Sequence, residues 1–315
     1  MPHQYIGYRT TARGSTFIQA FSPVKQAPLE ARYPVATREE VDEAMWLAQS
    51  AFPAFRQMPG ARRAAFLRAI ADEIEALGDR LVETACLETG LPEGRIKGER
   101  GRTCGQLRFF ADIAEEGSWC EAIIDTARPD ATPPRPDIRR MLVPMGPVVV
   151  FGASNFPLAF STAGGDTASA LATGNPVVVK AHELHPGTHA LVAEAIVCAA
   201  RRTDMPEGVF SALYGRHEVG QWLVQHEAAE AVAFTGSYGG GMALYRLAQQ
   251  RPRPIPVFAE MGSINPVFVT PEALEGDAEG LARQLAASVT LGAGQFCTNP
   301  GLIVVFGESQ TNEFA

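Results

Sequence analysis

From residue 147 onward, short apolar runs alternate with helical patterns, and this alternation limits the possible folds more than any other feature of the sequence. The apolar runs, several of them rich in valine, lie at 148–151, 176–180, 209–213, 231–234, 255–259 and 264–269. Helical patterns lie at 167–172, 187–201, 241–250 and 281–291. Apolar strands connected by helices are typical of a parallel sheet that is covered on both faces. The sequence therefore predicts an α/β fold built on a parallel sheet.

The part of the chain before this alternation is predicted to be helical and amphipathic. Thr37, followed by two glutamates, is typical of a helix N-terminus, and apolar residues then recur at helical spacing up to Phe52. Two further helical patterns cover 67–77 and 81–90. Residues 121–140 interrupt this character, because a short strand-like run is followed by crowded prolines. Such a stretch packs poorly into a core, so an extended arm or hairpin is predicted.

The composition indicates a globular protein with enough residues for two domains. The chain has 315 residues, of which 46% are hydrophobic and 20% charged. Its net charge of −8 argues against a surface for nucleic acid or for anionic membranes. The most apolar stretch, 141–160, contains three prolines, so it is interpreted as a buried strand and turn and not as a membrane span. No leader pattern is visible at the N-terminus, and a reducing cytoplasm is the expected compartment.

The cysteines and histidines indicate neither a disulfide framework nor a metal site. There are five cysteines, an odd number, and no two of them are spaced Cys-x-x-Cys. His182, His185 and His189 lie close together in the sequence, but they fit a loop between a strand and a helix better than a set of metal ligands. We therefore predict that the protein holds no metal.

One cysteine stands apart from the others. Cys297 lies in the segment Gly-Gln-Phe-Cys-Thr-Asn-Pro at 294–300, where a glycine-rich loop can expose the sulfur and turn backbone N–H groups towards a substrate oxygen. The alternative is a buried cysteine that packs as a small hydrophobe. We expect that role for the remaining four cysteines, Cys86, Cys104, Cys120 and Cys198.

Two charged residues end apolar runs. Glu260 follows 256–259, and desolvation there should raise its pKa, which suits a general base; the alternative is an acid that faces water. Lys180 ends the run 176–179 at the strand end where open α/β sheets bind ligands, and the alternative is a lysine that extends into solvent.

Two turns are also candidates for the site. Asn155 precedes Phe-Pro, and on spacing alone it is a turn asparagine. The segment Thr-Gly-Ser-Tyr-Gly-Gly-Gly at 235–241 lies between a strand and a helix, where glycines let the backbone approach a pyrophosphate. A flexible loop is the alternative for this segment.

Taken together, these segments resemble the aldehyde dehydrogenase superfamily in its non-acylating, NAD(P)-dependent branch. The resemblance implies that Cys297 is the nucleophile that forms a thioester and that Glu260 is the base that activates water. It also implies that the amide of Asn155 holds the oxyanion together with the Cys297 N–H, and that Phe156 lines the aldehyde channel.

The same resemblance implies a dinucleotide site. Lys180 would contact the adenosine ribose, and Glu183 would pair with its hydroxyls, which favours NAD. His182 and Lys180 could instead accept the 2′-phosphate of NADP, so the choice between NAD and NADP stays open. The remaining cofactor contacts that the resemblance implies are Gly236, Ser237, Gly241 and Met261.

Finer features narrow the resemblance to the α-ketoglutarate semialdehyde (2,5-dioxovalerate) dehydrogenases. They are the run from Ala153 to Thr167, the segment Lys180-Ala181-His182 and the cysteine segment. The expected substrate is therefore a small-molecule aldehyde, oxidised to α-ketoglutarate. The expected organisation is a Rossmann-like NAD(P)-binding domain at 1–118 and 143–258, an oligomerisation arm at 119–142 and the start of an α/β catalytic domain at 259–315.

Members of this superfamily are longer than this chain, so an N-terminal part of a longer enzyme is expected, with a homo-oligomer as the state of the full-length protein. Three alternatives remain open at this point. The chain could be a catalytically inactive cofactor-binding module, or an acylating enzyme that passes the thioester to coenzyme A. A cysteine hydrolase would need a histidine partner, and no motif identifies one.

Overall fold

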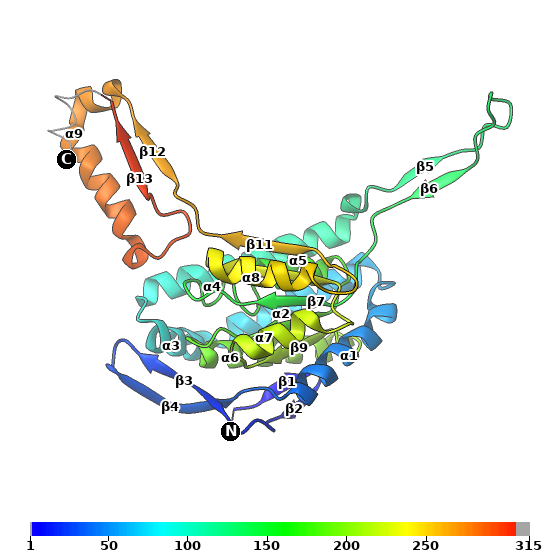
Figure 1. Cartoon of the computed structure of the whole chain (residues 1–315), viewed down its shortest axis with the longest axis horizontal. Coiled ribbons are helices and arrows are strands. Elements are labelled where there is room, and N and C mark those ends of the chain that lie inside the picture. The colour runs from blue at the N-terminus through cyan, green and yellow to red at the C-terminus, as the bar shows by residue number, and fades with distance from the viewer. Residues whose placement is uncertain (1, 307–315) are drawn as a thin grey trace.

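The computed structural model describes residues 2–306, and a seven-stranded sheet forms its centre (Figure 1). The strand order is β11-β10-β7-β8-β9-β1-β2. Five neighbouring strands are parallel, namely β7 (Val148–Phe151), β8 (Val177–Lys180), β9 (Phe210–Leu213), β10 (Ala231–Gly236) and β11 (Val257–Met261). The predicted parallel sheet is confirmed, and each apolar run between 148 and 259 forms one of these strands.

Helices cover both faces of the sheet. One face packs against α2 (Gly60–Ala76), α3 (Gly78–Thr89), α4 (Glu93–Glu116), α5 (Gly165–Ala172) and α6 (Pro186–Arg202). The other face packs against α1 (Arg38–Phe55), α7 (His217–Gln225) and α8 (Tyr238–Gln249). Because side chains alternate along a strand, Val148 and Val150 enter the first core, whereas Val149 and Phe151 enter the second. This two-sided burial explains why the strands are apolar throughout.

The prediction of a helical N-terminal part is correct from α1 onward and wrong before it. Residues 4–34 form β1 (Gln4–Ile6), β2 (Arg9–Thr11), β3 (Phe17–Ser22) and β4 (Ala27–Pro34). Burial alternates strictly along β3, which is the period of a strand with one covered face. The predicted helix start is confirmed: the Thr37 hydroxyl accepts from the Glu40 N–H at 3.3 Å, and the Glu40 carboxylate accepts from the Thr37 N–H at 2.8 Å.

The sequence pattern did not predict α4 or α7. Four glycines inside α4 lower its intrinsic helix propensity, and its hydrophobic periodicity is weak. Packing compensates, because Ile96, Cys104, Leu107 and Ala111 are fully buried in the first core.

A two-stranded arm extends away from the sheet (Figure 1). It consists of β5 (Ile123–Asp125) and β6 (Ile138–Arg140), which pair antiparallel. Apolar side chains on and beside the arm are exposed, namely Ile124, Ile138, Met141 and Leu142.

The last described segment forms a smaller body on the opposite side of Figure 1 from the arm. It contains β12 (Pro266–Val269) and β13 (Leu302–Val305), which are parallel, with α9 (Pro271–Thr290) between them. The helix begins ten residues earlier than the predicted 281–291, at the proline that follows β12. The chain leaves the large sheet only after Met261, so the expected domain boundary at 258 falls inside β11.

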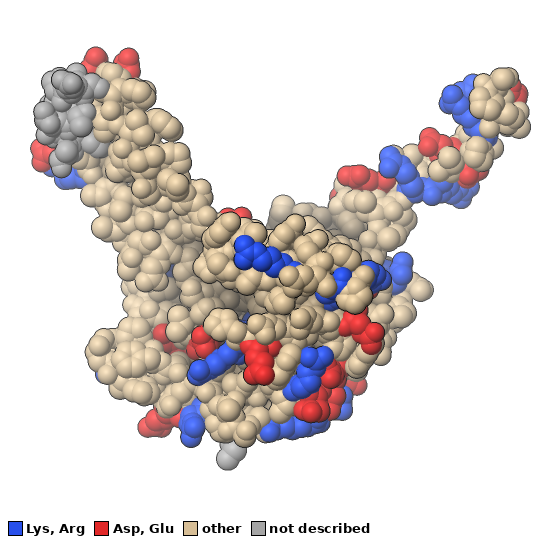
Figure 2. All heavy atoms as spheres, viewed as in Figure 1, with Lys and Arg blue, Asp and Glu red and all other residues tan. Residues whose placement is uncertain are grey.

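Acidic and basic side chains are intermixed on the face drawn in Figure 2, and no field of one sign covers it. None of the helices within residues 2–306 combines the length and the apolar character that crossing a bilayer would require.

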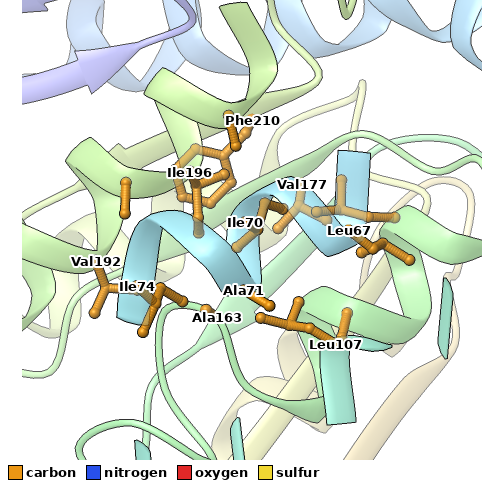
Figure 3. Packing of buried hydrophobic residues seen from close by; sticks show 14 of the residues in the cluster. Leu67, Ile70, Ala71, Ile74, Leu107, Ala163, Val177, Val192, Ile196 and Phe210 are labelled. Atoms are coloured by element: carbon orange, nitrogen blue, oxygen red, sulfur yellow. The ribbon is translucent and has the colours of Figure 1, made fainter. Parts of the chain in front are cut away.

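Figure 3 shows the centre of the first core, where Ile70 of α2 lies near Val177 of β8 and Ile196 of α6. Because Ile70 is fully buried, the change Ile70→Ala should lower the free energy of unfolding by about 2–5 kcal/mol. Chemical denaturation measures this loss. The matched change Asp72→Ala on the exposed face of α2 removes one exposed ion pair and should cost at most about 1 kcal/mol. Equal losses for the two variants would contradict the proposed packing.

Candidate active site

The strand order creates a fork at β7, and the candidate site lies at this fork. The chain continues from β7 to β8 on one side, whereas β10 pairs with β7 on the other side. In open parallel sheets, ligands bind at the carboxyl ends of strands where the order reverses in this way. Two cavities open here, and both are lined by Ser154 after β7 and by 235–237 at the end of β10.

The larger cavity measures about 720 Å³ and brings the predicted catalytic residues together. Asn155 and Phe156 reach it from the turn after β7, Glu260 from β11, and Cys297 from the loop before β13. These residues come from three segments that are far apart in the sequence, and they line one cavity in the fold. Phe156 is almost fully buried, with 5% exposure, and its ring forms part of the cavity wall.

The loop that carries Cys297 has an unusual backbone. Gly292, Ala293 and Gly294 all have positive φ, at 58°, 57° and 71°. Two of these three positions are glycine, which adopts this region without steric cost. The turn reverses the chain after α9 and leaves Cys297 half-buried at the cavity.

Asn155 ties this loop to the turn after β7. Its amide donates to the carbonyl oxygen of Gln295 at 2.5 Å. An amide group carries two hydrogens, so this bond leaves one for another acceptor in the cavity.

Sequence reasoning missed a second asparagine that holds the same loop. The Asn265 amide donates to the carbonyl oxygens of Cys297 at 2.8 Å, Asn299 at 3.1 Å and Ser263 at 3.2 Å. Asn265 itself has a φ of 47°, a region that asparagine tolerates better than most residues. Its place directly before Pro266 and near a glycine is the available signal, whereas the apolar run 264–269 predicts only a strand there.

Glu260 lies in the cavity but not in the expected environment. It sits beside Thr235 of β10, near the end of β11, and it is exposed. The prediction that apolar neighbours desolvate it is wrong, because alternate residues of this edge strand face solvent. A second acid lies close to it: burial, and then the charge of Glu260, raise the pKa of Asp166 at the start of α5.

The smaller cavity measures about 310 Å³ and contains most of the predicted cofactor contacts. Lys180, His182, Glu183, Gly236 and Ser237 line it. Burial lowers the pKa of Lys180 to about 8, and its ammonium donates to the Ala181 carbonyl at 3.0 Å.

Arg216, which the sequence analysis missed, adds a cation to this cavity. It lines the wall and lies 3.6 Å from the Glu183 carboxylate. It immediately precedes α7, a helix that the sequence pattern did not indicate, so its position at the strand ends was not visible in advance.

His182 lines the smaller cavity as a neutral ring, and its role as a phosphate contact stays a prediction. Burial, and then the neighbouring His185 and Lys180, lower the pKa of His182 to about 3, so its ring is neutral at neutral pH. Its Nδ1 accepts from the Leu184 N–H at 3.2 Å. Only its other ring nitrogen remains as a donor.

The start of α8 fits an anionic group. Ser237 caps the helix by accepting from the Gly240 N–H at 3.2 Å, and Gly236 and Gly240 line the cavity. A helix N-terminus with glycines around it accommodates a pyrophosphate. A Cβ at Gly241 would lie 2.6 Å from the sulfur of Met261, so these two residues pack α8 against β11. Neither residue lines the two cavities, and their roles as cofactor contacts stay predictions.

The other four cysteines differ in exposure, and Cys86 and Cys120 are half-buried. Cys104 is buried, and burial raises its pKa to about 11, as expected for a packing residue. Cys198 is exposed on α6, so the expectation that it packs in the core is wrong.

In the part of the chain that the structure describes, no three histidine, cysteine or acidic side chains gather in a metal-binding group.

Removing the amide of Asn265 should loosen the cysteine loop. Asn265→Gly keeps the left-handed backbone accessible while deleting the three contacts, so the amides of Asn299 and Gly301 should exchange about tenfold faster or more. Hydrogen exchange followed by mass spectrometry or NMR measures this change. The control Thr298→Ala truncates an exposed side chain in the same loop and should leave the exchange rates unaltered. Unchanged exchange in the glycine variant would mean that Asn265 does not hold the loop.

Comparison with known proteins identifies the family. Residues 9–314 match the aldehyde dehydrogenase family. The chain is 55% identical over 312 residues to alpha-ketoglutaric semialdehyde dehydrogenase 2 of Azospirillum brasilense, covering 98% of this chain and 59% of that protein. It is 49% identical over 302 residues to alpha-ketoglutaric semialdehyde dehydrogenase of Acinetobacter baylyi, covering 96% of this chain and 57% of that protein. The chain thus spans somewhat more than half the length of these relatives.

Solved structures have the same fold. The crystal structure of an NAD-dependent aldehyde dehydrogenase from Sinorhizobium meliloti aligns with a TM-score of 0.82 at 26% identity, over 99% of this chain and 60% of that one. The sequence match over almost the whole chain and the shared fold lead to one conclusion. This chain belongs to the aldehyde dehydrogenase family.

Proposed function

We propose that this chain carries the cofactor site and the reacting cysteine of an enzyme that oxidises α-ketoglutarate semialdehyde to α-ketoglutarate with NAD or NADP. The observation that carries the proposal is the single cavity lined by Asn155, Glu260 and Cys297, which adjoins the cavity at the start of α8. The names of the relatives at 55% and 49% identity support the substrate.

The first step uses the sulfur of Cys297. The thiolate attacks the carbonyl carbon of the aldehyde, and the carbonyl oxygen becomes an oxyanion. The amide hydrogen of Asn155 that is not bonded to Gln295, together with the Cys297 N–H, would hold this oxyanion. The tie to Gln295 orients the Asn155 amide before the substrate arrives.

When bound, a nicotinamide cofactor supplies the acceptor for the hydride that the tetrahedral carbon loses. The start of α8 would hold its pyrophosphate, and Glu183 would face its adenosine ribose. Once the hydride has left, the acyl group remains on Cys297 as a thioester.

Glu260 completes the reaction. Its carboxylate takes a proton from water while the water oxygen attacks the thioester carbon, and the carbon–sulfur bond then breaks. The products are the carboxylic acid and the regenerated thiolate. A carboxylate in the cavity favours water as the acyl acceptor over coenzyme A, which would need no base. Detection of an acyl-CoA product would favour the acylating alternative.

The exposed apolar side chains of the β5–β6 arm support the expectation of a homo-oligomer for the full-length protein. This expectation remains a prediction.

The change Cys297→Ala should abolish acid formation, with a loss of about 10³-fold or more, because it removes the sulfur that would form the thioester. Product appearance with α-ketoglutarate semialdehyde and NAD⁺ measures turnover, and calorimetry measures cofactor affinity, which should persist. The matched control Cys198→Ala removes an exposed, distant thiol and should leave turnover intact. Cofactor binding without turnover in the unmodified chain would favour the inactive-module alternative.

Glu183 should disfavour the 2′-phosphate of NADP. In Glu183→Gln, the affinity for NADP relative to NAD should rise by about tenfold, because one like charge is removed beside the cations Arg216 and Lys180. The ratio of the two dissociation constants reports this change. Glu218→Gln, an exposed acid in the first turn of α7, serves as the control. An unchanged ratio in the Glu183 variant would contradict this arrangement of the ribose site.

A further inference from the structure

Three phenylalanines form one wall of the larger cavity. Phe156 packs edge-on against Phe160, with ring centroids 5.0 Å apart, and against Phe296, with centroids 5.2 Å apart. Phe296 directly precedes Cys297, and all three rings line the cavity. An apolar wall of this kind suits the methylene groups of a substrate but contributes nothing to recognise a negative charge.

Two arginines of α4 lie against this wall. The guanidinium carbon of Arg95 is 4.5 Å from the centre of the Phe156 ring and 5.2 Å from that of Phe296. The guanidinium carbon of Arg102 is 4.9 Å from the centre of Phe160 and 5.9 Å from that of Phe156. The two arginines are seven residues apart, so they lie on the same face of the helix, two turns from each other. Contacts between a cation and ring faces hold both guanidinium groups in place.

The charge of Arg95 is already paired. Its guanidinium lies 2.5 Å from Glu99, whose side chain has no exposed surface. The second oxygen of Glu99 accepts from the N–H groups of Leu158 and Ala159, both at 2.9 Å. Glu99 therefore fixes Arg95 and the turn that carries Phe156 and Phe160 at the same time.

Arg102 has no such partner. Among residues 2–306 it forms no ion pair, and its side chain is exposed beside the phenylalanine wall. Arg95, Glu99 and Arg102 together leave one positive charge beside the phenylalanine rings that line the cavity. A guanidinium that is held by ring contacts and lacks an anion is well prepared to bind a carboxylate through two parallel hydrogen bonds.

We propose that Arg102, supported by Arg95, is a carboxylate subsite that selects aldehydes with a carboxylate at the far end of a short chain. This inference rests on the proposed function, because it assigns the other end of the substrate whose aldehyde meets Cys297. The methylene groups would pack on the phenylalanine wall between the two ends. Arg102 is a specificity residue and takes no part in bond breaking.

The test compares two substrates of similar length, α-ketoglutarate semialdehyde and the neutral aldehyde pentanal. In Arg102→Gln, the KM for the semialdehyde should rise by roughly 10- to 100-fold, while its kcat and both constants for pentanal stay within about twofold. Arg102→Lys keeps the positive charge but not the two parallel N–H donors of a guanidinium, so its KM for the semialdehyde should lie between those of the unmodified protein and Arg102→Gln. Lys97→Gln removes an equal charge from the same helix, where Lys97 pairs with Glu93, and should change neither substrate's constants.

A binding measurement separates this inference from the proposed function. Calorimetry with α-ketoglutarate on the Cys297→Ser variant should show an affinity that Arg102→Gln lowers by about tenfold or more and Lys97→Gln leaves unchanged. Such Arg102-dependent binding, together with an absence of turnover in the protein that retains Cys297, would contradict the proposed function and support the subsite. Turnover in which Arg102→Gln affects the two aldehydes equally, or neither, would overturn the subsite alone. Binding of α-ketoglutarate that does not depend on Arg102 would also overturn it.

Discussion

The parallel pairing of β7 with two neighbours is the constraint on which the site depends. The chain moves from β7 to β8 and β9 in one direction, and β10 with β11 is added on the other side. The connections after β7 and β10 therefore separate at the same edge of the sheet, and the space between them is not filled by a crossover. Both cavities use this opening. The two buried cores keep the strands in register, because each strand contributes side chains to both faces.

Beyond the sheet, the reacting loop is held chiefly by polar contacts to its backbone. Asn155 reaches the Gln295 carbonyl from the large body, and Asn265 reaches the Cys297 and Asn299 carbonyls from the smaller one. Hydrogen bonds are directional, so they fix the orientation of a loop more closely than apolar packing does. The sulfur is consequently positioned from two sides while it remains open to the cavity.

Much of the fold and part of the site could be predicted from the sequence. Runs such as 148–151 predict strands because a strand that is buried on both faces consists of apolar residues only. The segments that contain Cys297, Glu260 and Asn155 resemble those of a known family, and the fold brings these residues to one cavity. The predictions failed where tertiary contacts override local preference. The glycine-rich α4 is a helix because it packs on α2, and Glu260 is exposed because β11 lies at the sheet edge. Arg216 and Asn265 could not be assigned, since their roles depend on groups far away in the sequence.

The buried carboxylate of Glu99 also limits which substitutions near the site can change the substrate preference of a protein with this fold. Loss of Arg95 alone would leave a buried anion with only two backbone N–H donors, which is costly in a low-dielectric interior. Replacing Arg102 would leave no buried anion unpaired, because Arg102 is exposed and has no carboxylate partner among residues 2–306. A change of substrate preference towards neutral aldehydes would therefore begin with a substitution at position 102, whereas positions 95 and 99 would have to be substituted together.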